Sequence, residues 1–340
     1  MSWKKLGLAF LILFFICGTL ITIGQQPALA KELKLITATY APPAYKDAWQ
    51  PLQHFIDYIN EHGKGKVNID FYHSGTLLKA EELLPGLMQG TADMIFHTDS
   101  YIMGTLPILG ILELPFLYDD LESKVKNTAI GSPLYKLINE ELAKKNIFMI
   151  TAGITLPPEH IWTNTRPIRK PDDLKGLRIR IAGRIEAMVI KTLGGASTTM
   201  SSAEVYEALA RGTVDGVMCY LGTIPARSLQ EKLKYVNKGY FAAYGEQLYI
   251  RLDKWNSLPP DVRKLILEAS KSLEKQSIEY VIPYHEKNYW PLIKKAGIEI
   301  IVPTPNEQKM FKERIKPVWD WWKGLLPPGV GEKAIKLATD

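Results

Sequence analysis

Two arginines, Arg178 and Arg180, lie two residues apart in the short apolar segment 177–181. Side chains alternate along a β-strand, so both guanidinium groups would lie on one face and the apolar side chains on the other. Gly183 follows, and a helical pattern of apolar residues begins there. A strand that ends in arginine and leads into a helix N-terminus is suited to hold an anion. An edge strand with one solvated face explains the same pattern, so this segment alone leaves both interpretations open.

The sequence contains no familiar catalytic motif. Its 6 histidines are scattered, and it lacks a zinc-protease helix, a nucleophile elbow, a phosphate-binding loop and a dinucleotide fingerprint. Cys219, at the end of a predicted strand, could be a nucleophile beside a histidine, but a small buried side chain is the simpler role. His97 could be a base or a ligand contact, and a structural histidine fits equally well. The sequence therefore favours a protein that binds over one that catalyses, with no catalytic residue, cofactor or metal site expected.

The first thirty residues predict a secretory signal peptide. Lys4 and Lys5 form a basic start, an uncharged apolar run covers 6–23, and the sequence 28–30 supplies an A-x-A cleavage site. An uncleaved membrane anchor is the alternative, because the run is nearly long enough to span a bilayer. Cleavage would lower the formal charge from +6 to +4, which is too modest to indicate nucleic-acid binding. It would also leave Cys219 as the single cysteine, so no disulfide is expected. We expect a periplasmic protein, tethered to the cell surface if the segment is retained.

A repeat indicates two similar lobes. ELLPGLMQGTADMIF, from Glu82, aligns without gaps with EVYEALARGTVDGVM, from Glu204. Each copy predicts a helix that stops at glycine and leads into a buried strand. The mature chain of about 310 residues also exceeds the usual size of a single hydrophobic core.

The remaining pattern predicts an α/β fold with a ligand site at the strand ends. Strand-like segments alternate with helices, which favours mostly parallel sheets; they cover 33–39, 67–72, 92–97, 147–154, 177–181, 214–219 and 247–252. An amphipathic helix runs from Pro259 to about Lys295, with a kink expected at Pro283, and could brace both lobes. Ligands of open α/β sheets bind beyond the carboxyl ends of strands. That rule predicts that four segments face one cleft: 40–43, 97–100, 180–183 and 219–222.

Five motifs, in order, resemble the solute-binding proteins of TRAP (tripartite ATP-independent periplasmic) transporters. They are SGTLLKAEELLPGLMQGTADM, LELPFLY, RPIRKPDDLKGLRIR, EVYEALARGTVDG and WNSLPPDVRKLILEAS, within a similarity that runs from about Leu33 to Leu325. The resemblance implies a two-lobed periplasmic-binding-protein-like fold, type II-like, with mostly parallel sheets, crossing strands and a long interlobe helix. It also implies closure around one small organic carboxylate, and delivery to the small and large membrane subunits of an ion-gradient-driven transporter.

The expected lobes are discontinuous in sequence. Lobe I would comprise 31–153 with about 245–282. Lobe II would comprise 154–244 with about 283–340, including the C-terminal helices.

The resemblance also suggests site residues. Arg180 stands where the family clamps a substrate carboxylate, a task for which a planar guanidinium is suited. His160 stands where many members carry a second arginine, and Cys219 where many carry an asparagine. With Phe116 and Trp162 added, this less polar wall suggests a monocarboxylate with an apolar body.

Further contacts are expected from the strand-end rule. Thr98, Tyr40 and Tyr220 should face the cleft, and Lys79 could reach a second anionic group, although an exposed charge at a helix start explains it as well. Two alternatives stay open. One is an exported enzyme on the same scaffold, with Cys219 or His97 as the reactive group. The other is a binding protein that serves a sensor or receptor.

Overall fold

The computed structural model describes residues 32–118 and 120–340, so the predicted signal peptide at 1–30 lies outside the described residues. The strands are β1 Leu33–Ala38, β2 Val67–Tyr72, β3 Met94–His97, β4 Ile147–Thr163, β5 Arg178–Ile181, β6 Ala196–Thr199, β7 Gly216–Cys219, β8 Tyr235–Arg251 and β9 Glu299–Ile301. The helices are α1 Lys46–His62, α2 Leu83–Gln89, α3 Asp99–Ile102, α4 Leu121–Thr128, α5 Pro133–Ala143, α6 Arg184–Thr192, α7 Val205–Ala210, α8 Thr223–Ala226, α9 Leu252–Ser257, α10 Pro260–Tyr284, α11 Trp290–Lys295, α12 Pro305–Ile315, α13 Pro317–Lys323 and α14 Val330–Thr339. Short 3-10 helices cover Ala80–Glu82, Pro107–Leu112, Pro171–Leu174 and Leu229–Glu231.

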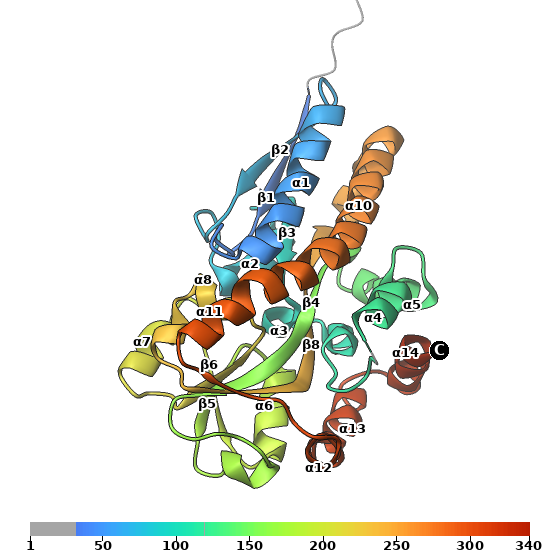
Figure 1. Ribbon diagram of the computed structural model, residues 1–340. Coiled ribbons are helices and arrows are strands. Elements are labelled where there is room, and N and C mark those ends of the chain that lie inside the picture. Colours follow the sequence, from blue (N-terminus) through green and yellow to red (C-terminus); the bar gives the residue numbers. More distant parts are fainter. Residues whose placement is uncertain (1–31, 119) are drawn as a thin grey trace, which may run out of the picture.

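Two lobes share one continuous sheet with the strand order β2-β1-β3-β8-β4-β7-β5-β6, and β9 pairs with β8. Strands β1 to β3 belong to lobe I and β5 to β7 to lobe II, and the long strands β4 and β8 cross between them (Figure 1). Pairs within each lobe are parallel, whereas β3–β8, β4–β8 and β4–β7 are antiparallel. The predicted strands 147–154 and 247–252 are therefore parts of two crossing strands of 17 residues each.

The two copies of the sequence repeat have the same local structure. In lobe I, Asp93 Oδ2 accepts a hydrogen bond of 2.9 Å from the backbone N–H of Ile36 in β1. In lobe II, Asp215 Oδ2 accepts one of 2.9 Å from the backbone N–H of Arg178 in β5. The backbone N–H groups of both aspartates donate back to the same residues. Each aspartate thus fixes the start of one strand against its parallel neighbour, which confirms the predicted repeat.

The long helix predicted from Pro259 spans the molecule in three parts. Helix α10 ends at Tyr284, a π-helical turn covers His285–Tyr289, and α11 continues to Lys295. Proline has no backbone N–H to donate, so Pro283 weakens the α-helical pattern just before the wider turn. That turn contacts lobe I: His285 Nε2 lies 2.6 Å from Asp47 Oδ2, at a buried position of α1.

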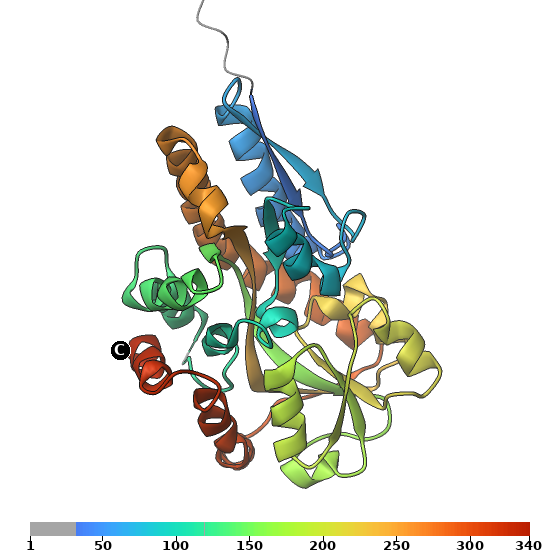
Figure 2. The ribbon, with the colours of Figure 1, turned by 180° about the vertical axis from the view of Figure 1, so that it is seen from behind.

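The C-terminal helices lie along one side of the molecule, where α14 packs on α4 and α5 (Figure 2). Trp322 of α13 is fully buried, and its Nε1 donates a hydrogen bond of 2.8 Å to the carbonyl of Pro107. Gly110 makes room for the indole, because a Cβ at this position would overlap Trp322 Nε1.

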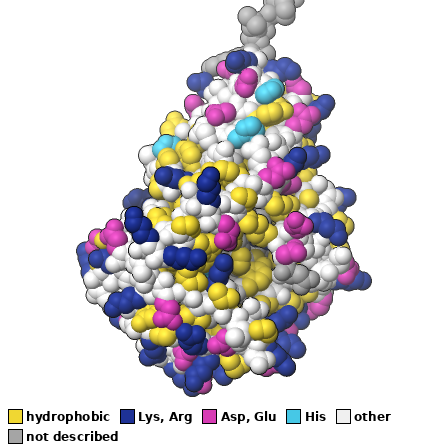
Figure 3. Space-filling model, in the orientation of Figure 1, with side chains coloured by type: hydrophobic (Ala, Val, Ile, Leu, Met, Phe, Trp, Pro, Cys, Tyr) yellow, Lys and Arg dark blue, Asp and Glu magenta, His cyan; other side chains and the backbone are white. Residues whose placement is uncertain are grey.

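Basic, acidic and apolar side chains are interspersed over the face of the molecule drawn in Figure 3. Among residues 32–118 and 120–340, no helix combines the length and the apolar character that a membrane span requires.

Candidate functional site

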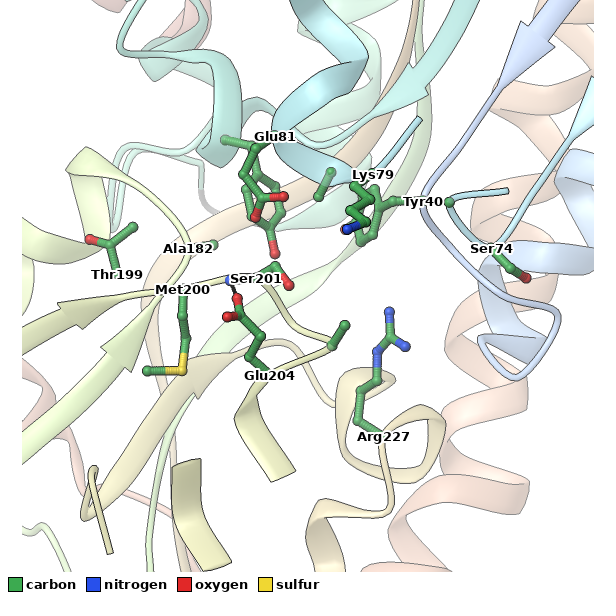
Figure 4. A pocket seen from close by; sticks show the side chains of 14 residues that line it. Tyr40, Ser74, Lys79, Glu81, Ala182, Thr199, Met200, Ser201, Glu204 and Arg227 are labelled. Carbon is green, nitrogen blue, oxygen red and sulfur yellow. Dashed lines mark hydrogen bonds between the residues drawn. The ribbon is translucent and has the colours of Figure 1, made fainter. Parts of the chain in front are cut away.

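The cleft between the lobes holds a cavity of about 860 Å³ (Figure 4). Residues that follow strand ends reach it from both lobes, as the strand-end rule predicts. Tyr40, Lys79 and Tyr101 line it from lobe I, and Ala182, Ser201 and Arg227 from lobe II. In Figure 4 the guanidinium group of Arg227 points across the cavity toward Lys79 and Tyr40.

Arg180 is buried next to this cavity, with 2% of its surface exposed. Its Nε and Nη2 donate to the carbonyl of Met200, at 3.0 and 2.7 Å, and Nη2 also donates to the hydroxyl of Tyr101 at 3.0 Å. Met200 and Tyr101 both line the cavity. Among the described residues Nη1 has no hydrogen-bond partner, so the guanidinium group retains donors for an anion.

Arg178 has a different role. Its Nε and Nη2 bind both carboxylate oxygens of Asp215, at 3.0 and 2.8 Å, and Nη2 also donates to the carbonyl of Gly212. About half of the Arg178 side chain is exposed. The two arginines in segment 177–181 are thus separated into one structural ion pair and one buried cation at the cleft.

Four side chains join the lobes across the cleft beside Arg180. The Tyr101 hydroxyl also accepts a hydrogen bond of 2.9 Å from the backbone N–H of Ser202. The Ser202 hydroxyl accepts from Tyr45 at 3.2 Å and from Arg227 Nη2 at 3.1 Å. Arg227 Nε lies 3.3 Å from the Tyr45 hydroxyl. Tyr45 and Tyr101 belong to lobe I and the others to lobe II, so this network joins the two lobes across the cleft.

Two predicted site residues lie on strands next to Arg180. His160 of β4 and Cys219 of β7 are cross-strand partners, and Arg180 of β5 pairs with Val217, two residues before the cysteine. His160 Nδ1 lies 2.9 Å from the carbonyl of Gly239, and burial lowers the pKa of this histidine to about 4. Burial, followed by the nearby Glu159 carboxylate, raises the pKa of the Cys219 thiol. At neutral pH both side chains are uncharged, so Arg180 supplies the positive charge at this position.

A second group of predicted residues lies at the strand ends of lobe I and at the end of β7. Tyr40 lines the cavity, and its ring packs edge-on against His97 and Tyr101. Thr98 and Tyr220 are fully buried. In the described part of the chain, the Thr98 and Tyr220 hydroxyls and both His97 ring nitrogens have no hydrogen-bond partner. Buried polar groups of this kind are normally paired, so these are candidates for solute or water contacts.

Phe116 and Trp162 lie away from this cavity. Phe116 lines a separate apolar groove with Trp319, near the C-terminal helices. Trp162 is fully buried in the core of lobe II, stacked on Trp290, and its Nε1 donates to the carbonyl of Cys219 at 3.2 Å. The two aromatic residues therefore do not form an apolar wall of the cavity.

Sequence reasoning missed Tyr101, Ser202 and Arg227. Tyr101 lies four residues after His97, in the first helical turn beyond β3, so a slightly wider strand-end window would include it. Ser202 follows β6, a strand that the sequence analysis did not predict. Arg227 follows the short helix α8, eight residues beyond the end of β7, and no local signal marks it.

Comparison with known proteins identifies a family. A family model described as bacterial extracellular solute-binding protein, family 7, matches residues 39–324. The C4-dicarboxylate-binding protein DctB of Bacillus subtilis strain 168 is 25% identical over 290 residues, covering 84% of this chain and 81% of that protein. The 2,3-diketo-L-gulonate-binding periplasmic protein YiaO of Escherichia coli K12 is 25% identical over 283 residues, covering 81% and 83%.

Solved structures share the fold. A TRAP periplasmic solute-binding protein from Shewanella oneidensis, with bound succinate, has a TM-score of 0.81 at 17% identity, covering 91% of this chain and 100% of that chain. DctP7 of Bordetella pertussis, an extracytoplasmic solute receptor binding pyroglutamic acid, has a TM-score of 0.80 at 21% identity, covering 90% and 99%. The predicted two-lobed α/β fold with crossing strands and a long interlobe helix is confirmed.

Proposed function

Because the chain belongs to the bacterial extracellular solute-binding proteins of family 7, we propose that it captures one small organic acid in the cleft between its lobes, with Arg180 as the principal anchor for the carboxylate. The observation that carries the proposal is the position of Arg180. It is a buried cation beside the cavity, and it is hydrogen-bonded to Tyr101 of the opposite lobe. A guanidinium group can donate two parallel charge-assisted hydrogen bonds to a carboxylate, which a lysine cannot do.

Capture works through closure of the lobes. A solute that contacts both lobes stabilises the closed state by the difference between its affinities for the closed and open states. Tyr101 would contact the solute from lobe I, and Arg180 and Arg227 would contact it from lobe II. We retain the expected lobe boundaries, 31–153 with about 245–282 and 154–244 with about 283–340, as part of this proposal.

The lining of the cavity offers both polar and apolar surface to the body of the acid. Tyr40, Thr199, Ser201 and Glu204 contribute hydroxyl and carboxyl groups, and Ala80, Ala182 and Met200 contribute apolar surface. Phe116 and Trp162, which with Cys219 suggested an apolar monocarboxylate, do not line it. The volume of about 860 Å³ lies within the range of small-molecule sites.

Binding without turnover fits the chemistry of the reactive groups. Burial lowers the pKa of His97 to about 3 and raises the pKa of the Cys219 thiol, so the thiolate form that a nucleophile needs is disfavoured. We propose that the protein is exported to the periplasm by its signal peptide and delivers its solute to the small and large membrane subunits of a TRAP transporter. Genes for those subunits beside its own would support a transport role over a sensor.

Thermal unfolding of the chain that begins at Lys31 tests the proposal. The panel contains succinate, L-malate, D-glucuronate and pyroglutamate, each with the corresponding amide. A ligand present at about 1,000 times its Kd stabilises by about 4 kcal/mol, which raises the Tm by several degrees in a protein of this size. The proposal predicts a rise for at least one acid and none for its amide. No rise with any acid, or an equal rise with the amide, would contradict it.

A further inference from the structure

Four carboxyl side chains are buried close together, and two of them, Glu159 and Glu186, face Arg180. Asp99 belongs to α3, Glu113 follows the 3-10 helix 107–112, Glu159 belongs to β4 and Glu186 to α6. Each is exposed by 2% or less. We call these four residues the buried carboxyl cluster. Ionised carboxylates are rarely buried without a compensating charge, so the cluster requires a physical account.

Only part of the cluster is satisfied by hydrogen bonds. Ser100 donates its hydroxyl to Glu113 Oε1, and the backbone N–H of Gly183 donates to Glu186 Oε2 at 2.7 Å. Three further oxygens of the cluster, Glu113 Oε2, Glu186 Oε1 and Glu159 Oε2, are buried and have no partner among residues 32–118 and 120–340. A protonated carboxyl group can donate a hydrogen bond to a neighbouring carboxylate, whereas two ionised groups can only repel each other.

The cluster lies where the two lobes meet. Ser100 follows β3 of lobe I, and Gly183 and Glu186 follow β5 of lobe II. The contact is so close that a Cβ on Gly183 would overlap the carbonyl oxygen of Ser100. Opening the lobes at this contact would expose the carboxyl groups to water, and closing them would remove that water.

The nearby cations do not balance four carboxylates. Arg180 attracts the Glu159 and Glu186 carboxylates electrostatically, and Lys124 of α4 attracts those of Asp99 and Glu113. Lys124 Nζ donates to the carbonyl of Tyr244 at 2.7 Å and has no other polar partner in the described chain. Two cations against four carboxyl groups leave two negative charges, and two bound protons would remove them. Among residues 32–118 and 120–340, the other titratable groups that face the cluster are Tyr249, which donates its hydroxyl to Asp99, Tyr118, which also faces Asp99, and Cys219, which faces Glu159.

Burial and the mutual repulsion of the carboxylates also favour protonation, because both raise the pKa values of the cluster. Burial, then the Glu186 and Asp99 carboxylates, raises the pKa of Glu113 well above its usual range. Burial, then Glu186, raises the pKa of Glu159 well above its usual range, although Arg180 opposes this shift. Burial also raises the pKa of Glu186, and that of Asp99 to about 7.

We propose that the buried carboxyl cluster couples solute capture to proton uptake, so that the closed, solute-bound protein holds at least one proton more than the open protein. The inference rests on the proposed function, because the solute drives closure. Closure removes water from Glu113 and Glu186, and the solute carboxylate places a further negative charge beside Arg180. Both changes favour the protonated form of the cluster. The protons come from the buffer and return to it when the lobes open.

The direction of the pH dependence follows from linkage. The closed state binds more protons than the open state. Its stability relative to the open state is therefore greatest at low pH, and this extra stability is lost as the pH rises through the raised carboxyl pKa values. Within that window the solute affinity should fall by up to tenfold per pH unit for each proton taken up. At pH 6 to 8 the carboxyl groups of D-glucuronate and pyroglutamate are ionised throughout. The second carboxyl groups of succinate and L-malate still bind some protons near pH 6, so the proton number for these two acids is corrected for protonation of the free solute.

Calorimetry counts these protons directly. The panel acid that raises the Tm most is titrated into the protein at pH 6.5 in two buffers of different ionisation enthalpy, phosphate and Bis-Tris. The proposal predicts a positive proton number that persists when NaCl is replaced by KCl. A proton number of zero, or an affinity that follows the sodium concentration instead, would overturn it.

Glutamine variants locate the protons. Glu113→Gln and Glu159→Gln are uncharged analogues of the protonated residues and keep an acceptor oxygen. Each should keep solute affinity at pH 6 and lower the proton number by at least half. Glu274→Gln is a matched control: Glu274 is buried, its Oε1 accepts from Thr151 at 2.5 Å, and burial raises its pKa to about 7, but it lies on α10 outside the cluster. It should keep the proton number of the unmodified protein.

The outcomes separate the two proposals. Solute binding with no proton uptake would overturn the coupling and leave the proposed function intact. A proton number unchanged in both cluster variants would assign the protons elsewhere and also overturn it. If the cluster variants fail to fold, the two-buffer experiment on the unmodified protein still decides. Failure of every acid to bind would overturn the proposed function, and the coupling with it.

Discussion

Arg180 and Tyr101 come from different lobes and are joined by a hydrogen bond of 3.0 Å from Nη2 to the phenolic oxygen. The same oxygen accepts a second hydrogen bond from the backbone N–H of Ser202 at 2.9 Å. With both lone pairs occupied, the hydroxyl is left with its own hydrogen to donate. A solute carboxylate held by Arg180 would be a suitable acceptor, so we expect this tyrosine both to join the lobes and to contact the ligand.

Replacement of this hydroxyl should weaken solute binding more than folding. In Tyr101→Phe the ring that stacks on His97 is kept, but Arg180 and Ser202 lose an acceptor. We expect an affinity loss of about 10- to 100-fold, because hydrogen bonds to charged groups contribute about 1.5–3 kcal/mol. Titration calorimetry with the best panel acid measures it.

Tyr135→Phe provides the control for that loss. The Tyr135 hydroxyl donates to the carbonyl of Ile150 at 3.0 Å, within lobe I. The variant should lower the free energy of unfolding by about 1 kcal/mol and leave the affinity unchanged. Equal affinities for Tyr101→Phe and the unmodified protein would contradict a role for the cross-lobe hydroxyl.

Gly183 should control closure through its missing side chain. Its φ of −148° and ψ of −168° are accessible to alanine, so backbone strain is not the issue. A Cβ would overlap the Ser100 carbonyl oxygen across the lobe contact. Gly183→Ala should therefore keep a native-like Tm without solute, favour the open state and bind the panel acid at least 10-fold more weakly, about 1.4 kcal/mol.

Gly104→Ala is the matched change at a tolerant position. A Cβ there would lie 3.5 Å from Cδ of Arg184, an ordinary contact between the same lobes. Small-angle scattering should give a larger radius of gyration for Gly183→Ala than for Gly104→Ala, both with excess acid. If the two variants close alike, the proposed steric role of Gly183 is wrong.

The buried His160 predicts a loss of stability in mild acid. Burial lowers its pKa from 6.5 to about 4. Below pH 6.5 the unfolded chain binds a proton that the folded chain does not, so this residue reduces stability as the pH falls from 6.5 to about 4, with no further change below. The loss approaches about 3 kcal/mol, at 1.36 kcal/mol per pKa unit.

Urea unfolding at pH 6.5 and pH 4.5 tests this assignment. His160→Asn can still donate to the carbonyl of Gly239 but cannot titrate, so its stability should fall less between the two pH values. The exposed His54 serves as the control, because His54→Asn should keep the pH dependence of the unmodified protein. An unchanged pH dependence in His160→Asn would show that other groups cause the acid sensitivity.

The sequence pattern predicted features that depend on local periodicity or on repetition. The helix–Gly–Thr unit at Glu82 and Glu204 predicted two similar lobes, and Asp93 and Asp215 play equivalent roles in them. The two crossing strands, of 17 residues each, were predicted too short. Several irregularities interrupt their register, so their side chains do not alternate regularly between the two faces along the whole strand. Strand β6, with mostly exposed small polar residues, gave no apolar signal.

The candidate site was predicted only in part, and the reason is tertiary. Arg180 and Tyr40 lie where strand ends converge, which a sequence can indicate. Arg227 reaches the cavity because a short helix turns back toward the cleft, and no local pattern encodes that turn. Phe116 and Trp162 were expected to form a less polar wall of the site with Cys219, but packing against the C-terminal helices and against Trp290 directs them elsewhere.

The most direct test of the carboxylate anchor compares two arginines on the same strand. Solute affinity is measured by calorimetry for Arg180→Lys and for Arg178→Lys, each at matched thermal stability. Lysine keeps the charge but cannot donate two parallel hydrogen bonds to a carboxylate. A hydrogen bond to a charged group contributes about 1.5–3 kcal/mol, so Arg180→Lys should bind the panel acid at least about 10-fold more weakly. Arg178→Lys, whose cation pairs with Asp215 outside the cleft, should bind as tightly as the unmodified protein. Equal affinities in the two variants would contradict the account, because Arg180 would then be a structural cation and not the anchor of the solute.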